Sequence, residues 1–312
     1  MRMYNAADVL VFLYKYTKAS VFLEQNIGGS HRFGVYMMEG GNPLKHKPKI
    51  GLALGSGGAR GFAHLGVIRV LQEENIDISY IAGSSMGALI GSMFAAGTDL
   101  EQLYKVVMSF KRKYYLDFTV PKMGFIKGNR LKDFIGIFTQ WRNIEDLPIP
   151  LAVVATNIKT GEKVVMKEGP VADAVRASVA VPGIFVPVKI GDQLLVDGGV
   201  VDRVPISVVK EMGADLVISV DVLRVKEDAE LNSIYDVILQ TLDILQLEIM
   251  KSRQIKADVM LNPRVEKYSS SGFTNIDEIV ALGEQEARKH IGQIKTMIAD
   301  WEERQGSELE EN

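Results

Sequence analysis

A serine flanked by glycines is the first feature of the sequence that can carry chemistry. Positions 83–87 read Gly-Ser-Ser-Met-Gly and fit G-x-S-x-G, between a strand-like run, Ile76–Ala82, and a helical run, Ala88–Ala96. In this context the pattern predicts a tight turn that presents the Ser85 hydroxyl as a nucleophile at a helix N-terminus, with Gly83 and Gly87 making room for the turn. The alternative is a plain turn whose serine only caps the helix.

A glycine-rich loop at 55–61 follows the first predicted strand and reads Gly-Ser-Gly-Gly-Ala-Arg-Gly. As a nucleotide-binding loop it would cradle phosphates on backbone N–H groups, but a G-x-G-x-x-G match begun at its first glycine ends on arginine. The other interpretation is an oxyanion hole, in which the N–H groups of Gly57 and Gly58 stabilise the charge created when Ser85 attacks a carbonyl. The serine motif one strand later favours acyl transfer.

Asp197 ends a short apolar strand and is followed by two glycines. Glycines there let a substrate or another backbone approach the carboxylate closely, although Asp-Gly is also a common hairpin turn. A serine nucleophile needs a base, and a carboxylate in direct contact can serve when burial raises its pKa from roughly 3.9 toward neutrality. Asp197 is therefore the candidate base.

The four histidines are weaker candidates for that base. His31 and His46 lie in a linker-like stretch, His290 falls inside a long predicted helix, and His64 falls in the helix after the glycine loop, where a packing role is expected. No two have the spacing of a metal-binding pair, and the chain has no cysteine, which excludes thiol nucleophiles, disulfides and cysteine-ligated metals. We expect neither a metal nor another cofactor.

The composition is that of an ordinary globular protein. Apolar residues make up 47% and charged residues 24% of the 312 residues, which is enough to bury a large core. The 36 basic and 39 acidic residues give a net charge of −3 and no reason to expect nucleic-acid binding. No apolar stretch near the start approaches the roughly 20 residues of a membrane span or resembles a secretory signal. A cytoplasmic location is the resulting expectation.

Strand-like and helix-like runs alternate from Pro48 to about residue 262, which is typical of an α/β protein whose mostly parallel sheet is covered on both faces. Beyond the elements around the motifs, strands are predicted at 151–156, 163–166, 193–196, 216–221 and 258–261, and helices at 171–177, 206–212, 234–254 and 276–298.

Three segments are predicted: an N-terminal helix and linker at 1–48, a catalytic domain at 49–262, and a C-terminal helix with an acidic tail at 263–312, packed on the domain or trailing from it. The apolar positions of residues 8–24 have helical spacing, so this helix is expected either to make a peripheral membrane contact or to pack on the domain or a partner. The aromatic and basic stretch 110–115 is a candidate cap over a pocket, or a solvated loop. The acidic end from Asp300 is expected to be partly disordered.

Taken together, the three motifs resemble the patatin-like phospholipase family, in its bacterial branch related to neuropathy target esterase. The resemblance covers about 50–221 and includes the stretch 176–185, Arg-Ala-Ser-Val-Ala-Val-Pro-Gly-Ile-Phe. It implies a three-layer α/β/α sandwich and a Ser–Asp dyad without histidine that hydrolyses acyl esters of phospholipids or related lipids. Residue by residue, it implies Ser85 as nucleophile, Asp197 as base, Gly57 and Gly58 as oxyanion hole, and Arg60 and Gly61 as its supporting loop. Ser56 departs from the family, in which many members have glycine.

The expectation is thus a serine esterase of the phospholipase or lysophospholipase type, acting on a lipid or another acyl ester at or near a membrane surface. Two other classes stay open: a regulatory or membrane-associated scaffold with weak catalysis, and a nucleotide-binding protein that uses the glycine-rich loop. No expectation for the oligomeric state follows.

Overall fold

The apolar runs predicted as strands form the central sheet of a computed structural model, which describes residues 47–109, 117–120, 122–223, 233–252 and 256–310. The N-terminal helix predicted at 8–24 and the candidate cap at 110–115 lie outside the described residues. Lys47–Glu303 forms one compact unit, to which the following description refers.

The sheet has eight strands among the described residues, in the order β5-β6-β3-β2-β1-β7-β8, with β4 paired to β3. Neighbouring strands from β3 through β2, β1 and β7 to β8 run parallel, whereas β4 and β6 run antiparallel to β3, and β5 runs antiparallel to β6. The strands are β1 Ile50–Leu54, β2 Ile78–Ser84, β3 Leu151–Asn157, β4 Lys163–Met166, β5 Val188–Ile190, β6 Gln193–Asp197, β7 Leu216–Val220 and β8 Val259–Leu261.

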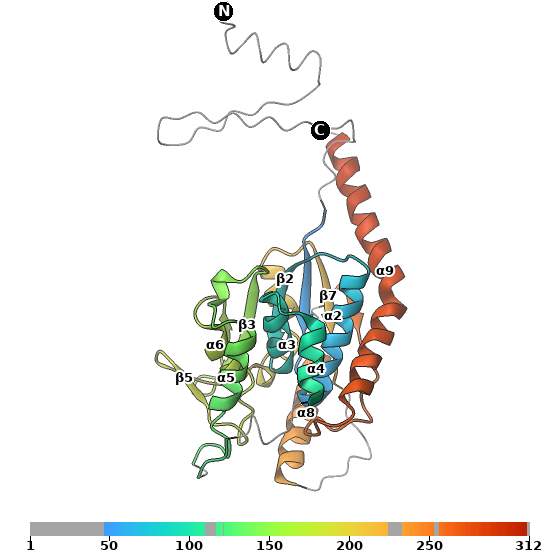
Figure 1. Cartoon of the computed structure of the whole chain (residues 1–312). Coiled ribbons are helices and arrows are strands. Elements are labelled where there is room, and N and C mark those ends of the chain that lie inside the picture. Colours follow the sequence, from blue (N-terminus) through green and yellow to red (C-terminus); the bar gives the residue numbers. More distant parts are fainter. Residues whose placement is uncertain (1–46, 110–116, 121, 224–232, 253–255, 311–312) are drawn as a thin grey trace, which may run out of the picture. The chain divides into compact units, whose positions relative to one another are not determined.

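Alternate residues of the central strands pack on opposite faces of the sheet. One face, with Leu52, Ile81 and Ile218, joins a core that includes residues of α2, α3, α4 and α9 (Figure 1). The other face, with Ala53 and Ala82, packs on α7. The predicted α/β fold with a mostly parallel sheet is therefore confirmed. The α-helices are α2 Ala63–Glu73, α3 Met86–Ala95, α4 Leu100–Ser109, α5 Asn129–Phe138, α6 Val171–Ser178, α7 Ile206–Glu211, α8 Ile234–Ser252 and α9 Ile276–Glu310, and the 3-10 turns are η1 Gly58–Phe62, η3 Ile144–Asp146 and η4 Gly198–Val200.

The C-terminal region differs in part from the expectation. Helix α9 continues through the acidic residues after Asp300 as far as Glu310, where the sequence suggested a partly disordered end. Residues 263–303 belong to the same compact unit as the sheet.

One edge of β3 brings the ends of two strands together. On this edge β2 pairs through Ser84 with Val154, and β6 pairs through Asp197 with Ala155. The opposite edge carries β4, which pairs with both Val154 and Ala155. Because β6 runs antiparallel to β3 and β2 runs parallel to it, the carboxyl ends of β2 and β6 point toward each other.

Helices α2 and α9 cross with their backbones in close approach. A Cβ atom on Gly66 of α2 would lie 2.0 Å from the Val280 carbonyl oxygen, and one on Gly283 of α9 would lie 2.0 Å from the Ala63 carbonyl oxygen. Only glycine fits at these two positions, because any side chain would force the helices apart.

This crossing predicts opposite effects for two glycines of the same helix. We expect Gly283→Ala to lower the free energy of unfolding by roughly 1–3 kcal/mol through overpacking. Gly292→Ala, whose Cβ would meet nothing within 4 Å, is expected to raise it by roughly 0.5–1 kcal/mol through helix propensity. Urea denaturation of both variants measures the difference; equal shifts would contradict the close crossing.

Candidate active site

Ser85 occupies the sharp turn between β2 and α3. Its backbone has φ 53° and ψ −120°, a conformation that costs energy for a residue other than glycine. The turn requires small neighbours, since a Cβ on Gly83 would lie 2.5 Å from the Ala88 nitrogen and one on Gly87 would lie 2.1 Å from the Leu54 carbonyl oxygen. The predicted strand–turn–helix arrangement is therefore present.

The Ser85 hydroxyl lies in direct contact with Asp197. Its Oγ donates to the Asp197 Oδ2 atom at 2.6 Å, although 112 residues separate the two in the chain. The second carboxylate oxygen, Oδ1, accepts from the Gly199 N–H at 2.7 Å. The Asp197 backbone is held as well: its N–H donates to the Ala180 carbonyl, and its carbonyl accepts from the Thr156 hydroxyl. The contact between the two side chains is thus rigidly positioned.

Burial sets the acidity of this carboxyl group. Asp197 is 5% exposed and Ser85 is 7% exposed. Removal from water raises the pKa of Asp197 to about 6, and the hydrogen bonds from Ser85 and Gly199 offset only part of that effect. The direction is the one that the sequence predicts for a carboxylate base.

The glycine-rich loop borders the same cavity as Ser85 through Gly58. Gly58 has φ +54°, and a Cβ there would lie 2.3 Å from the Ser270 carbonyl oxygen, whereas Ala59 donates its N–H to that oxygen at 2.9 Å. For the N–H groups of Gly57 and Gly58, the described part of the chain provides no hydrogen-bond acceptor. Of the two glycines, Gly58 lines the cavity, whereas Gly57 is buried and is not among the lining residues.

The other residues of the loop have structural contacts. Ser56, where the family often has glycine, donates its hydroxyl to Ser84 Oγ at 3.2 Å. A Cβ on Gly61 would lie 2.3 Å from Met86, so this glycine lets the loop pack on α3. His64 is fully buried with Nε2 2.7 Å from the Gly55 carbonyl oxygen, and burial lowers its pKa to about 4.

Arg60 anchors the loop to distant parts of the chain. Its guanidinium forms a buried ion pair with Asp243 of α8 at 3.2 Å and donates to the Tyr268 carbonyl at 2.8 Å. Burial lowers the pKa of Arg60 and raises that of Asp243 to about 6, the mutual attraction opposing both shifts. These contacts agree with a supporting role for Arg60.

Ser178 is a further residue at the site that the motifs do not identify. Its hydroxyl accepts the Ser85 N–H at 2.9 Å and donates to the Val154 carbonyl at 2.6 Å. It thereby ties the strained turn to β3. Its place in the stretch 176–185, which resembles the family, was the available signal.

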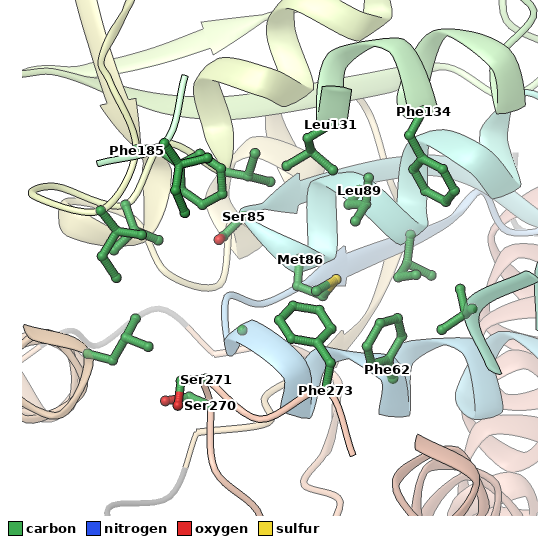
Figure 2. A pocket seen from close by; sticks show the side chains of 18 of the residues that line it. Phe62, Ser85, Met86, Leu89, Leu131, Phe134, Phe185, Ser270, Ser271 and Phe273 are labelled. Carbon is green, nitrogen blue, oxygen red and sulfur yellow. The ribbon is translucent and has the colours of Figure 1, made fainter. Parts of the chain in front are cut away.

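An apolar cavity of about 250 Å³ opens beside Ser85. Figure 2 shows Ser85 near Phe185, with Leu131 and Phe134 of α5 on one wall and Phe62 and Phe273 on another. The two rings Phe62 and Phe273 meet edge to face with centroids 5.8 Å apart. Apart from Ser85, few residues of the lining have polar side chains, and these are Ser270, Ser271 and Tyr235. Such a cavity suits a hydrocarbon chain.

The described residues show neither a metal-binding cluster nor a membrane-spanning helix. They contain no group of three or more His, Cys, Asp or Glu side chains that could hold a metal ion. None of their helices combines the length and apolar character needed to cross a bilayer.

Comparison with known proteins agrees with these features. The model of the patatin-like phospholipase family matches residues 52–210. An uncharacterised NTE family protein of Mycobacterium tuberculosis is 40% identical over 176 residues, covering 55% of this chain and 49% of the relative, so the chain spans about half the length of that relative. A lysophospholipase of Emericella nidulans is 27% identical over 281 residues, which cover 79% of this chain and 18% of the relative.

Among solved structures, VipD from Legionella pneumophila superposes with a TM-score of 0.57 over 88% of this chain and 70% of its own, at 14% sequence identity. At that identity the likeness concerns the fold alone. The family model spans both the glycine-rich loop and the Ser85–Asp197 contact. The chain therefore belongs to the patatin-like phospholipase family.

Proposed function

We propose that this protein is a serine esterase that hydrolyses lipid acyl esters with a Ser85–Asp197 dyad. The observation that carries the proposal is the 2.6 Å hydrogen bond from Ser85 Oγ to a buried carboxylate, made at the edge of an apolar cavity. A nucleophile in contact with a base and a site for an acyl chain are the parts that acyl transfer requires.

In the first half-reaction, Ser85 Oγ attacks the ester carbonyl while its proton passes to Asp197 Oδ2. The carbonyl oxygen gains negative charge in the tetrahedral intermediate. In this proposal the N–H groups of Gly57 and Gly58 form the oxyanion hole, because no described residue accepts a hydrogen bond from them. Collapse of the intermediate breaks the ester C–O bond, and Asp197 returns the proton to the departing alcohol, leaving an acyl group on Ser85.

In the second half-reaction, water takes the place of the alcohol. Asp197 removes a proton from water, the resulting hydroxide attacks the acyl-enzyme carbonyl, and the proton goes back to Ser85 as the acid leaves. One carboxylate therefore acts alternately as base and acid. A pKa of about 6 suits both tasks better than the ordinary value of 3.8.

The substrate class follows from the cavity and from the family. The walls present aromatic and aliphatic side chains, which favour a fatty acyl chain over a polar acid. The name of the Emericella nidulans relative, a lysophospholipase, supports a phospholipid or lysophospholipid. We also propose a cytoplasmic location, for which the absence of cysteine is the support.

The nucleophile is tested by covalent labelling. A fluorophosphonate is expected to label the purified protein, and Ser85→Ala is expected to abolish both labelling and ester hydrolysis, the latter by more than about 1,000-fold. The matched control is Ser271→Ala, a serine that lines the same cavity, which should keep its label. Equal labelling of the Ser85→Ala variant would refute the proposed nucleophile. Absence of labelling in the unsubstituted protein would instead favour a scaffold or a nucleotide-binding protein.

The base is tested by Asp197→Asn. We expect a loss of hydrolysis comparable to that of Ser85→Ala, because an amide cannot accept the serine proton. The same change should stabilise the fold at pH 8 by on the order of 3 kcal/mol, because a pKa raised from 3.8 to about 6 means that ionisation of Asp197 opposes folding.

The sign of that effect fixes its pH dependence. Below its unfolded-state pKa, the Asp197 carboxyl group does not lower the free energy of unfolding. The free energy of unfolding falls as the pH rises from that value through about 6. Thermal unfolding should therefore separate the Asp197→Asn variant from the unsubstituted protein at pH 8 and not near pH 4. A variant that is less stable at pH 8 would contradict the buried, costly carboxylate.

Activity should depend on pH through the same group. Since the reaction needs Asp197 ionised, we expect kcat/KM to rise about tenfold per pH unit below a midpoint near 6 and to level off above it. A soluble short-chain ester gives the profile without a lipid surface. A midpoint near the ordinary aspartate pKa would show that burial does not control the base.

A further inference from the structure

Helix α8, Ile234–Ser252, differs from an ordinary surface helix because apolar side chains lie on its exposed side as well as on its inward side, where Leu239 lines the cavity and Met250 packs on the core. The side chains that it buries include Asp243 and Gln246, which are 6% and 8% exposed. Its outward side presents large apolar side chains that are 38–59% exposed. We call this set the apolar face of α8: Ile234, Val237, Ile244, Leu245 and Ile249.

The two buried polar side chains of α8 contact the loops that carry the proposed catalytic residues. Asp243 pairs with Arg60 of the glycine-rich loop. Gln246 lies against Gly199, where a Cβ would be 2.7 Å from the glutamine Nε2. These two polar side chains face the interior, whereas the side chains of the apolar face remain 38–59% exposed.

A second exposed apolar segment lies beside the start of α8. It consists of residues 117–120 and 122–126, which we call the entrance loop, and the Phe125 ring packs on Tyr235 with centroids 5.9 Å apart. In this loop Phe118 is 68% exposed, Val120 80% and Met123 56%. Figure 1 draws the entrance loop and α8 at the same end of the unit.

Both segments border the cavity. Phe118, Tyr235 and Leu239 line it together with Ser85. Phe118 is at once a lining residue and largely exposed, so it stands at the mouth of the cavity. The exposed apolar surface is thus continuous with the apolar lining that leads to the nucleophile.

Both basic and acidic residues border this surface, the basic ones at the entrance loop and one exposed acid, Asp133, on α5 close to them. Lys122, Lys127 and Arg130 are exposed in and next to the entrance loop. Of the nearby acids, Asp117 accepts from the backbone N–H groups of Gly128 and Asn129. Asp236 accepts from the hydroxyls of Ser233 and Ser271, and Glu248 is exposed farther along α8. Exposed apolar side chains bordered by lysine and arginine complement an anionic lipid surface.

We propose that the apolar face of α8 and the entrance loop dock on an anionic lipid bilayer, so that the cavity opens directly onto the membrane. This inference rests on the proposed function, because it concerns how a lipid reaches Ser85. A protein seated on the same surface would close the mouth of the cavity, whereas a bilayer both covers the apolar side chains and supplies the acyl chain.

The absence of cysteine allows a site-specific test. Leu245→Cys places a single thiol on the apolar face of α8, and Ile137→Cys places one on α5 at a similarly exposed apolar position, 65% against 54%. Each full-length variant also carries Ser85→Ala, so that no hydrolysis alters the lipid, and is labelled with an environment-sensitive fluorophore. The probe is a vesicle of phosphatidylcholine with a minor share of phosphatidylserine.

We expect vesicles to shift the emission to the blue at position 245 and not at position 137. In the same Ser85→Ala background, Val237→Gln with Leu245→Gln should lower the vesicle-bound fraction in co-sedimentation about tenfold, at an unchanged thermal unfolding midpoint. Ile137→Gln should leave binding unchanged. Because neither measurement uses the dyad, failure here leaves the esterase proposal to its own labelling test.

Three results would overturn the docking proposal. No response to vesicles, or an equal response at both positions, would remove the bilayer as the occupant. A blue emission at position 245 before vesicles are added, growing with protein concentration, would assign the surface to a second copy of the chain. The same emission independent of concentration would assign it to the chain's own N-terminal segment.

Discussion

The site depends on the meeting of two strand ends on one edge of β3. Because β2 arrives parallel to β3 and β6 arrives antiparallel, Ser84 and Asp197 pair with consecutive residues of β3, Val154 and Ala155. The residue after Ser84 is the proposed nucleophile, and a register difference of one residue in β6 would turn the Asp197 carboxylate to the other face of the sheet.

Burial makes this contact useful and also makes it costly. The small residues around the turn let backbones close over the carboxylate; a Cβ on Gly198, for example, would lie 2.1 Å from the Val154 carbonyl oxygen. Exclusion of water is what raises the pKa of Asp197, and the strained backbone of Ser85 is held in place by Ser178. The fold therefore spends part of its stability at the site, as functional sites commonly do.

The sequence predicted the features that depend on local patterns of residues, and it predicted less well those that depend on tertiary packing. The glycine loop, the serine turn and Asp197 could be found because close backbone approach demands glycine at particular spacings. Helices α4 and α5 were not predicted: Leu103 and Leu131 line the cavity, so the apolar faces of these short helices are completed by residues distant in sequence. The contact of Ser178 with the Ser85 turn was not predicted either, since a serine at a helix end has many structural uses.

Helix α8 shows a limit of amphipathic patterns. The sequence predicted a helix at 234–254, and the structure has one at Ile234–Ser252, but a rule that places apolar residues inside does not tell which of its apolar residues face outward. Buried Asp243 pairs with Arg60, and buried Gln246 lies against Gly199. Since an unpaired buried arginine costs far more than an exposed leucine, the pairing of Arg60 with Asp243 outweighs the cost of an outward Leu245. A bilayer in contact with the exposed apolar surface, as proposed, would remove the remaining cost.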